Sequence, residues 1–456
     1  MCIRDREQTL PDRSVVTRRY ADFDSGDLPA YIGVNGIELG TQTFDGLKRL
    51  YKSDTGGRKR TLYYKPGQNR PERVFTPSKQ WVDYEYNPVL GEEPLKRVSS
   101  RFTADYQYDS ENARLLSCTE DGQTLEREYF STGQMKLERR KEGDEVFEMQ
   151  YAFSYRERML SYTDVLGQVQ DYEYDAAGRL LQTTLGSTVA MFAYDTLGRT
   201  SEIATRDGDN FLITQLEYDD FDRETLRRFD MKGEIQTLTQ RYDECDRIVV
   251  KTLWPGEPGE DQRRQAEVYA DRVRGKVFQP AASADVNERL KNIYAKHKPF
   301  NSGAGGVLNG ENWLRNEVYA YESRGRLYDY KCSGELAPVD PQGHVIRGQA
   351  FEFDALDNIV LVITELTDKD TDAPGENVAE YFFEYEDPAQ LSKITNSYEG
   401  YTAEQRLTYD DDGNLEDDGE GMEMEYDATG RLRSVVKAGG TSNYYYDGVD
   451  RLSGQS

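Results

Sequence analysis

The stretch that decides the fold is Tyr172-Glu173-Tyr174-Asp175-Ala176-Ala177-Gly178-Arg179-Leu180-Leu181-Gln182-Thr183-Thr184. Its tyrosines alternate with a charged residue, a pattern that predicts a β-strand with one aromatic face. Asp175 can accept a hydrogen bond from a backbone N–H two residues on, and Gly178 can adopt the positive φ that a short hairpin loop needs. Residues 180–184 suit the return strand. The stretch therefore predicts a β-hairpin whose tip is the phrase 174–180.

This seven-residue phrase, Tyr-Asp-x-x-Gly/Asp-Arg/Asn and then a mostly apolar residue, recurs along the chain. Strict copies occupy 174–180, 194–200, 218–224, 242–248, 409–415, 426–432 and 446–452, and looser copies occupy 44–50, 321–327 and 353–359. Within a series the phrases start 17 residues apart (409 to 426) to 24 residues apart (194 to 218). That interval fits two strands and two turns but no helix of normal length. A lone hairpin is marginally stable, so we expect the copies to stack.

The registry of the hairpins is expected to depend on the residues at the phrase tips. They are Tyr174, Asp175, Gly178, Arg179, Tyr194, Asp195, Gly198, Arg199, Tyr218, Asp219, Tyr242, Asp243, Tyr409, Asp410, Gly413, Tyr426, Asp427, Gly430, Arg431, Tyr446 and Asp447. Some copies carry Asp222, Asp246, Asp357 or Asp450 where others have glycine. Asp tolerates the left-handed region better than most residues, so these copies fit the same turn.

Composition limits the classes of partner. The formal net charge is −27, from 84 acidic and 57 basic side chains, which argues against binding to nucleic acid or to an anionic membrane. The same charge opposes edge-to-edge pairing of strands. The 33 tyrosines suit ribbons buried on one side, because the ring packs while the hydroxyl reaches a polar partner. The longest apolar run, 359–363, is too short to span a bilayer.

Candidate catalytic and metal-binding patterns are weak throughout the sequence. The four cysteines (Cys2, Cys118, Cys245, Cys332) lie far apart, and the two histidines, His297 and His344, argue against a zinc site. The acidic clusters 410–412 and 368–372 do not complete a calcium-loop pattern, so we expect solvated turns there. No spacing of carboxylates singles out a general acid and base. The sequence predicts a protein that is not an enzyme and has no catalytic residue, cofactor or metal.

Four segments follow from the distribution of the phrases. Residues 1–30 are poorly defined, and 1–6 match nothing that follows; 31–254 form the first repeat region, 255–316 an insertion flanked by Pro and Gly, and 317–456 the second repeat region. The insertion is a basic island, with nine basic and four acidic residues between 262 and 298, and a helix is expected over Ala284–His297 after an N-cap at Ser283. It either packs against the repeats or contacts an acidic partner.

Residues 163–169 read as a repeat that has lost its aromatic residue. The chain stops just after a hairpin tip, so it is expected to be a fragment.

The phrases resemble the YD repeats of RHS proteins, and the second half resembles a narrower group. Residues 321–327, Cys332-Ser333-Gly334, 338–341, 353–359, 387–391 and Ile394-Thr395 are similar to the insecticidal toxin complex C components and related bacterial RHS proteins. The resemblance covers most of residues 31–456. It implies an all-β fold, in which stacked hairpins form a curled or spiral β-sheet shell with one short helical insertion.

The resemblance also implies a function. In that family the shell encloses a C-terminal toxic domain, which an aspartyl self-cleavage site frees; neither segment can be matched here, so no catalytic residue is carried over. We expect a secreted or cell-surface bacterial protein whose partners are a C-terminal toxin cargo and other toxin-complex subunits. The alternative is an adhesion protein of the cell surface or wall, whose exposed tyrosines stack on carbohydrate. The two hypotheses differ in what is fused beyond the repeats, a toxin-like domain or an anchor.

Overall fold

The computed structural model describes residues 6–23, 28–90, 92–274, 312–368 and 370–456. Within them, almost all regular structure is antiparallel β-sheet. Residues at alternate positions of each strand lie on the same face of the sheet. One sheet has 30 strands and a second has six. Each strand pairs with its neighbours in sequence, so both sheets are long meanders of hairpins. The predicted all-β class of stacked hairpins is confirmed.

The 30-stranded sheet runs along most of the chain. Its first 23 strands are β1 (Arg6–Thr9), β2 (Val15–Tyr20), β3 (Pro29–Val34), β4 (Ile37–Phe44), β5 (Leu50–Thr55), β6 (Arg58–Tyr63), β7 (Arg73–Phe75), β8 (Trp81–Tyr86), β9 (Pro94–Ser99), β10 (Thr103–Tyr108), β11 (Leu115–Glu120), β12 (Gln123–Tyr129), β13 (Met135–Glu142), β14 (Glu145–Phe153), β15 (Met159–Thr163), β16 (Val169–Tyr174), β17 (Leu180–Leu185), β18 (Thr188–Tyr194), β19 (Thr200–Asp207), β20 (Asn210–Tyr218), β21 (Glu224–Met231), β22 (Glu234–Tyr242) and β23 (Ile248–Trp254). The segment before residue 31, which shows no repeat in sequence, thus contributes β1, β2 and the start of β3.

Helix α1 (Glu260–Arg274) follows β23. Acidic Glu260 and Asp261 occupy its first turn, where the helix dipole favours negative charge. Ala270 packs on Val249 and Val318 of the sheet, and Ala266 packs between Trp254 and Trp313. The sequence analysis did not anticipate this helix; the helix expected over 284–297 lies outside the described residues.

The sheet continues after the insertion without a break. Its last strands are β24 (Arg315–Tyr321), β25 (Leu327–Ser333), β26 (Val345–Phe353), β27 (Ile359–Thr367), β28 (Pro374–Phe382), β29 (Lys393–Asn396) and β30 (Glu404–Arg406). The small sheet comprises β31 (Thr408–Tyr409), β32 (Leu415–Asp417), β33 (Glu423–Tyr426), β34 (Leu432–Lys437), β35 (Gly440–Tyr446) and β36 (Leu452–Gln455). β23 pairs directly with β24, although the repeats are interrupted in sequence after Trp254.

The long meander has two rims, since its turns alternate between the two ends of the strands. The seven phrases of the 30-stranded sheet join strands at one end, which we call the phrase rim, and we use the same name for the turns of the three phrases in the small sheet. The opposite end, the tight-turn rim, carries short turns such as 56–57, 121–122, 186–187 and 208–209. Residues 163–169 form the predicted kind of turn, but they join β15 to β16 and therefore lie on the tight-turn rim.

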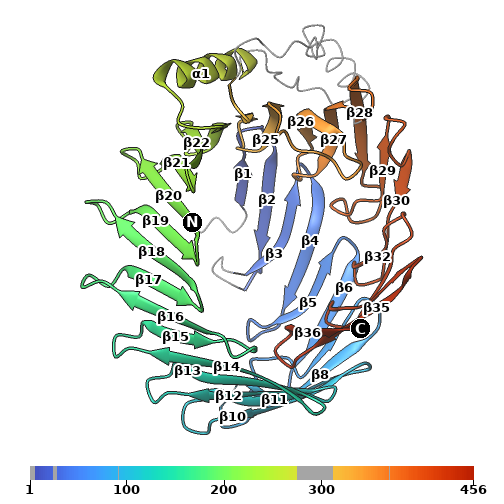
Figure 1. The fold of residues 1–456 in the computed structure, drawn as a ribbon. Coiled ribbons are helices and arrows are strands. Elements are labelled where there is room, and N and C mark those ends of the chain that lie inside the picture. The colour runs from blue at the N-terminus through green and yellow to red at the C-terminus, as the bar shows by residue number, and fades with distance from the viewer. Residues whose placement is uncertain (1–5, 24–27, 91, 275–311, 369) are drawn as a thin grey trace.

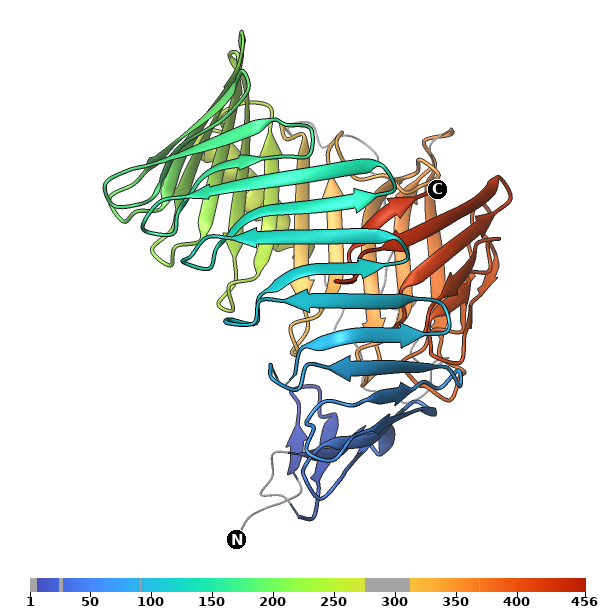
Figure 2. The same cartoon turned by 90° about the horizontal axis from the view of Figure 1, so that it is seen from below.

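The sheet curls back on itself. Figure 1 shows the sheet curving round until its C-terminal strands return to the first part of the chain, and Figure 2 shows the strands stacked across the curved wall. The last hairpin lies against β10 and β13, since Gly448 contacts Tyr106 and Arg451 contacts Glu138. Side-chain contacts support this arrangement, because Arg97 bonds to Asp450, 353 residues later. We call residues up to about 250 the first layer and residues from 315 the second layer. The buried residues form several small clusters along the wall, as expected of a repeat structure.

Candidate functional site: the latched rim and the seam between layers

The turn of each phrase is organised by its aspartate. In the phrase 174–180, the Asp175 carboxylate accepts the backbone N–H of Arg179 at 2.8 Å and its Nε–H at 2.8 Å, while the Gly178 N–H donates to the Asp175 carbonyl at 2.9 Å. Gly178 has φ +88°. The hydrogen bonds from the Arg179 backbone and side chain hold the pKa of Asp175 below its usual range.

A tyrosine bond links each of four phrases to the phrase before it. The hydroxyl of the first residue donates to the carbonyl of the last residue of the preceding phrase. These pairs are Tyr194–Leu180 at 2.7 Å, Tyr218–Thr200 at 2.8 Å, Tyr242–Glu224 at 2.8 Å and Tyr321–Ile248 at 2.9 Å. The last pair spans the insertion, so the links of the rim continue across residues 255–314. One such bond contributes about 1 kcal/mol.

The phrase arginine adds a second link. The Arg199 Nε–H donates to Asp195 of its own turn at 2.7 Å, and its guanidinium lies 4.8 Å from the centroid of the Tyr218 ring in the next phrase. Its Nη1 donates to Asp222 Oδ1 at 2.6 Å. Arg223 repeats these contacts on Tyr242 and Asp246. The arginine therefore ties two successive turns together.

Either aspartate or glycine occupies the fifth position of the strict phrases. Asp222, with φ +63°, holds the turn and accepts the preceding arginine. Where glycine stands instead, the preceding arginine fills the space of the missing side chain: a Cβ on Gly178 would lie 1.8 Å from Arg158 Nη2. The sequence analysis explained Asp at this position by its tolerance of positive φ; its role as a hydrogen-bond acceptor was missed.

The second layer docks its phrase rim on the tight-turn rim of the first layer. Four contacts mark this seam: Arg324–Asp12 at 3.0 Å, Arg58–Asp387 at 2.6 Å, Ser78 N–Asp412 Oδ1 at 3.0 Å and Tyr106 Oη–Gly448 O at 2.8 Å. The partners are 312 to 342 residues apart. One circuit of the curled sheet therefore takes a little over 300 residues.

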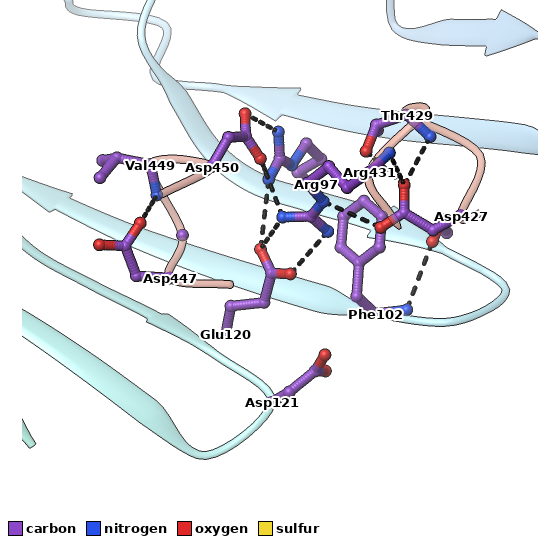
Figure 3. A network of polar contacts seen from close by, with 12 residues as sticks. Arg97, Phe102, Glu120, Asp121, Asp427, Thr429, Arg431, Asp447, Val449 and Asp450 are labelled. Carbon is purple, nitrogen blue, oxygen red and sulfur yellow. Dashed lines mark hydrogen bonds and ion pairs between the residues drawn. The ribbon is translucent and has the colours of Figure 1, made fainter. Parts of the chain in front are cut away.

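A buried cluster of charges lies at the centre of the seam, as Figure 3 shows. Glu120 is fully buried, and its carboxylate accepts hydrogen bonds from Arg431 at 2.7 Å, Arg97 at 3.2 Å and Arg433 at 3.3 Å. Asp427 accepts from Arg431 at 2.9 Å and from Arg433 at 2.8 Å.

Asp450 completes the cluster by accepting from Arg97 at 2.7 Å and from Arg431 at 2.9 Å. The three arginines thus donate to three carboxylates, and a fourth carboxylate, that of Asp121, lies 3.9 Å from Arg433 Nη1. The Arg431 guanidinium also lies 4.4 Å from the centroid of the Phe102 ring. Burial would raise the pKa of Asp427, but the Thr429 hydrogen bond and the Arg431 charge outweigh it and lower that pKa.

The predicted tip residues fall into two groups. Tips in the first layer lie along an exposed rim, whereas Asp427, Arg431 and Asp447 are buried in the seam. Glu120, Arg97 and Arg433 were not anticipated, because the contacts by which they join the two layers are made to partners more than 300 residues away in sequence.

In the acidic turns 410–412 and 368–372, aspartate carboxylates accept hydrogen bonds from groups of the chain itself. Asp410 accepts the N–H groups of Asp412 and Asn414. Asp368 accepts the Tyr398 hydroxyl at 2.8 Å. Within the described ranges, no group of three or more His, Cys, Asp or Glu could hold a metal ion. Of the helices in these ranges, none is long and apolar enough to cross a membrane.

His344 ties loops of the tight-turn rim. Its Nδ1 lies 2.9 Å from Asp340 Oδ2 and its Nε2 lies 3.6 Å from Asp368 Oδ2. The Tyr401 hydroxyl also donates to Asp340. Both ring nitrogens face carboxylates of the chain itself. Together with the Tyr401 bond, these contacts join the turn 340–344 to Asp368 and to the loop 397–402.

The comparisons with known proteins agree with this geometry. Residues 158–190 match the family model described as RHS Repeat. Over this stretch the chain carries an RHS repeat. The crystal structure of TcdB2–TccC3–Cdc42 matches with a TM-score of 0.62 at 13% identity, over 97% of this chain and 22% of that one. The crystal structure of TcdB2–TccC3 matches with a TM-score of 0.61 at 13% identity, over 97% and 23%.

The RHS-repeat chain thus shares its fold with these structures and spans less than a quarter of their length. No curated protein sequence matches it. The resemblance to an RHS-repeat shell, drawn above from the phrases and the intervening blocks, is confirmed.

Proposed function

We propose that this chain is a non-catalytic section of the wall of an RHS-repeat shell, which encloses and carries a C-terminal toxin domain of a secreted or cell-surface bacterial protein. The observation that carries the proposal is the seam. A sheet that curls through one circuit and docks its phrase rim on the layer before it makes a continuous wall. Such a wall separates a cargo from its surroundings by steric exclusion.

The contacts along the phrase rim suit a wall that resists unfolding and proteolysis. Between residues 174 and 248, each hairpin is joined to the next by the strand ladder, a tyrosine hydroxyl bond and an arginine contact. In a repeat structure, stability is approximately the sum of unit stabilities and neighbour interfaces. Contacts added at every neighbour interface therefore raise the cost of opening any one hairpin.

The adhesion hypothesis required exposed tyrosines for stacking on sugars. At the phrase rim, arginines lie over the tyrosine rings, as Arg179 does at 4.5 Å from the centroid of the Tyr194 ring. The Tyr194 hydroxyl already donates to Leu180. This arrangement weighs against the phrase tyrosines as a carbohydrate-binding ladder.

The test is to sequence the gene beyond the codon for Ser456, to express the full polypeptide, and to follow its limited proteolysis. A compact C-terminal domain that is protected in the intact protein, and cleaved faster when Glu120→Ala opens the seam, supports the proposal. Exposed Glu128 provides the matched control, since Glu128→Ala should leave protection unchanged. A frame that ends in a wall anchor or a sugar-binding module would contradict the toxin-carrier function.

A further inference from the structure

The turn of a phrase places no requirement on its third residue. The hydrogen bonds of the turn involve the second, fifth and sixth residues, as in the phrase 174–180. Gly448 does not have a positive φ, so turn geometry does not explain why it is glycine. In the seven strict phrases, the third residues in chain order are Ala176, Thr196, Asp220, Glu244, Asp411, Ala428 and Gly448.

Contacts across the seam explain the glycine at 448. A Cβ on Gly448 would lie 3.0 Å from both the Cβ and the Sγ of Cys118, which is fully buried in β11 of the first layer. The Gly448 carbonyl also accepts the Tyr106 hydroxyl at 2.8 Å, so the backbone is held close to the first layer. Cys118 therefore occupies the space that a side chain at 448 would need.

The other two phrases of the small sheet differ at the same position. Ala428 is buried and packs with Val82 and Phe102 of the first layer. Asp411 is exposed. Three successive phrases thus carry at this position a carboxylate that faces solvent, a methyl group packed on apolar side chains, and no side chain.

The charged contacts of the last two phrases are alike. Arg431 donates to the aspartate of its own turn and to Glu120 at 2.7 Å. Arg451 donates to the aspartate of its own turn and to buried Glu138 at 2.8 Å. Because each phrase supplies the same arginine and each site a buried glutamate, these pairs do not distinguish the two phrases.

The curl of the sheet does not by itself decide the register between the layers. From β10 to β35 the circuit contains about 25 strand spacings, or about 120 Å. A slip of the second layer by one hairpin moves it by two spacings, about 10 Å, which is roughly a tenth of the circuit. The twist between neighbouring strands varies by more than this change requires. Contacts at the seam must therefore select the register.

We propose that the third residues of the phrases in the small sheet fix the register in which the second layer docks on the first. If the phrase 426–432 took the place of 446–452, the Ala428 methyl group would stand 3.0 Å from Cys118. If the phrase 409–415 took the place of 426–432, the Asp411 carboxylate would lie against Val82 and Phe102, where a charge without a partner is costly. The inference goes beyond the proposed wall function and does not depend on a cargo.

The test exchanges the two small residues, because Ala428→Gly with Gly448→Ala keeps the composition of the chain. If a phrase needs only a small third residue, the exchange is neutral. If each site takes one residue, the new methyl group meets Cys118 and the seam opens more often. Iodoacetamide reaches buried Cys118 only when the phrase lifts, so we expect its alkylation, followed by peptide mass spectrometry, to be at least about ten times faster than in the wild type.

Exposed Cys245 is the internal reference, and its alkylation rate should not change. Ala176→Val enlarges a third residue outside the seam and should leave the Cys118 rate as in the wild type. In Cys118→Ala, hydrogen exchange of residues 446–455 replaces alkylation, and Gly448→Ala should accelerate it less than it does in the wild type. Melting curves check folding, and Gly448→Ala alone replaces the double variant if that variant does not fold.

Disulfide trapping reads the register directly. Gly448→Cys places a thiol beside Cys118, and diamide should oxidise the pair to a disulfide, whereas Ala428→Cys lies one hairpin away, about 10 Å, and should form none. Burial raises the pKa of Cys118 to about 11, so this thiol reacts slowly with a group that is not held beside it. A double variant alkylated at the wild-type rate, or an Ala428→Cys variant that bonds to Cys118 as readily as Gly448→Cys does, would overturn the proposal.

Discussion

Replacing Glu120 by alanine removes the carboxylate on which three arginines of the seam converge. Glu120 is fully buried and bonds to Arg97, Arg431 and Arg433. Glu120→Ala removes the one fully buried carboxylate that all three guanidinium groups share. Buried Asp427, half-exposed Asp450 and exposed Asp121 remain, so the guanidinium groups lose the counter-charge on their buried side. Breaking a buried pair from one side costs about 3–5 kcal/mol.

This cost should appear where the second layer docks. Strands β33 to β36 reach the first layer through this cluster and a few further contacts, so their release exposes much less than global unfolding. We expect native-state hydrogen exchange of residues 427–455 to speed up by at least about a hundredfold, since about 3 kcal/mol is a factor of more than one hundred. Amides of β16 to β22, far from the seam, should exchange as in the wild type.

The control is Glu128→Ala, which breaks an exposed ion pair to Lys136 at 3.0 Å. Exposed pairs contribute about 0–1 kcal/mol, so this variant should differ little from the wild type. Glu120→Gln keeps the shape and hydrogen-bonding capacity but loses the charge, and should fall between the two. If Glu120→Ala exchanges no faster at residues 427–455 than Glu128→Ala, the cluster does not hold the layers together.

Three further predictions concern the phrase rim. Gly178→Val should lower the free energy of unfolding by about 2–4 kcal/mol in denaturant melts, because a β-branched residue is strained at φ +88° and its Cβ would meet Arg158. Asp222→Asn should cost up to about 1 kcal/mol, with the loss shrinking in about 1 M salt, because it weakens the bond from Arg199. The pKa of Asp175 is lowered in the folded state, so its stabilising effect is complete above the unfolded pKa and is lost as pH falls through the folded one; the melting temperature should fall below about pH 4.

Each of these has a neighbouring control. Ala177→Val tests whether bulk alone matters in the turn, and Asp220→Asn tests the loss of an exposed charge beside Asp222. Asp175→Asn should flatten the acid side of the melting profile. Equal effects of Gly178→Val and Ala177→Val, or an acid profile that Asp175→Asn leaves unchanged, would contradict the turn chemistry described above.

The hairpin tips could be predicted from sequence because their chemistry is local. An aspartate that accepts backbone N–H groups within four residues, and a glycine with positive φ, specify the turn without help from the rest of the chain. The looser copies form the same turn: Lys48 and Asp357 take the positive-φ position in 44–50 and 353–359, and Glu322 replaces the aspartate in 321–327. Residues 163–169 show its limit, since the same turn formed on the opposite rim. The phrase defines a turn, but the number of strands between successive turns decides the rim on which each turn lies.

The interruption after Trp254 shows a second limit. In sequence the repeats stop there, yet β23 pairs with β24 and the tyrosine bond continues from Tyr321 to Ile248. A strand edge pairs with whatever compatible strand returns to it, and the intervening length is of little consequence. Loop-closure entropy grows only slowly with loop length, so a large insertion leaves the sheet intact.

By itself, then, the sequence determined the repeating unit: its turn, its aromatic face and the stacking of its copies. The tertiary structure alone decided that one circuit takes a little over 300 residues, that the phrase rim docks on the tight-turn rim, and that Glu120 meets Arg97, Arg431 and Arg433. The reason is physical. Turn geometry depends on neighbours within a few residues, whereas the layer met by a given rim depends on the curl accumulated over some thirty strands, to which each strand pair adds only a small twist.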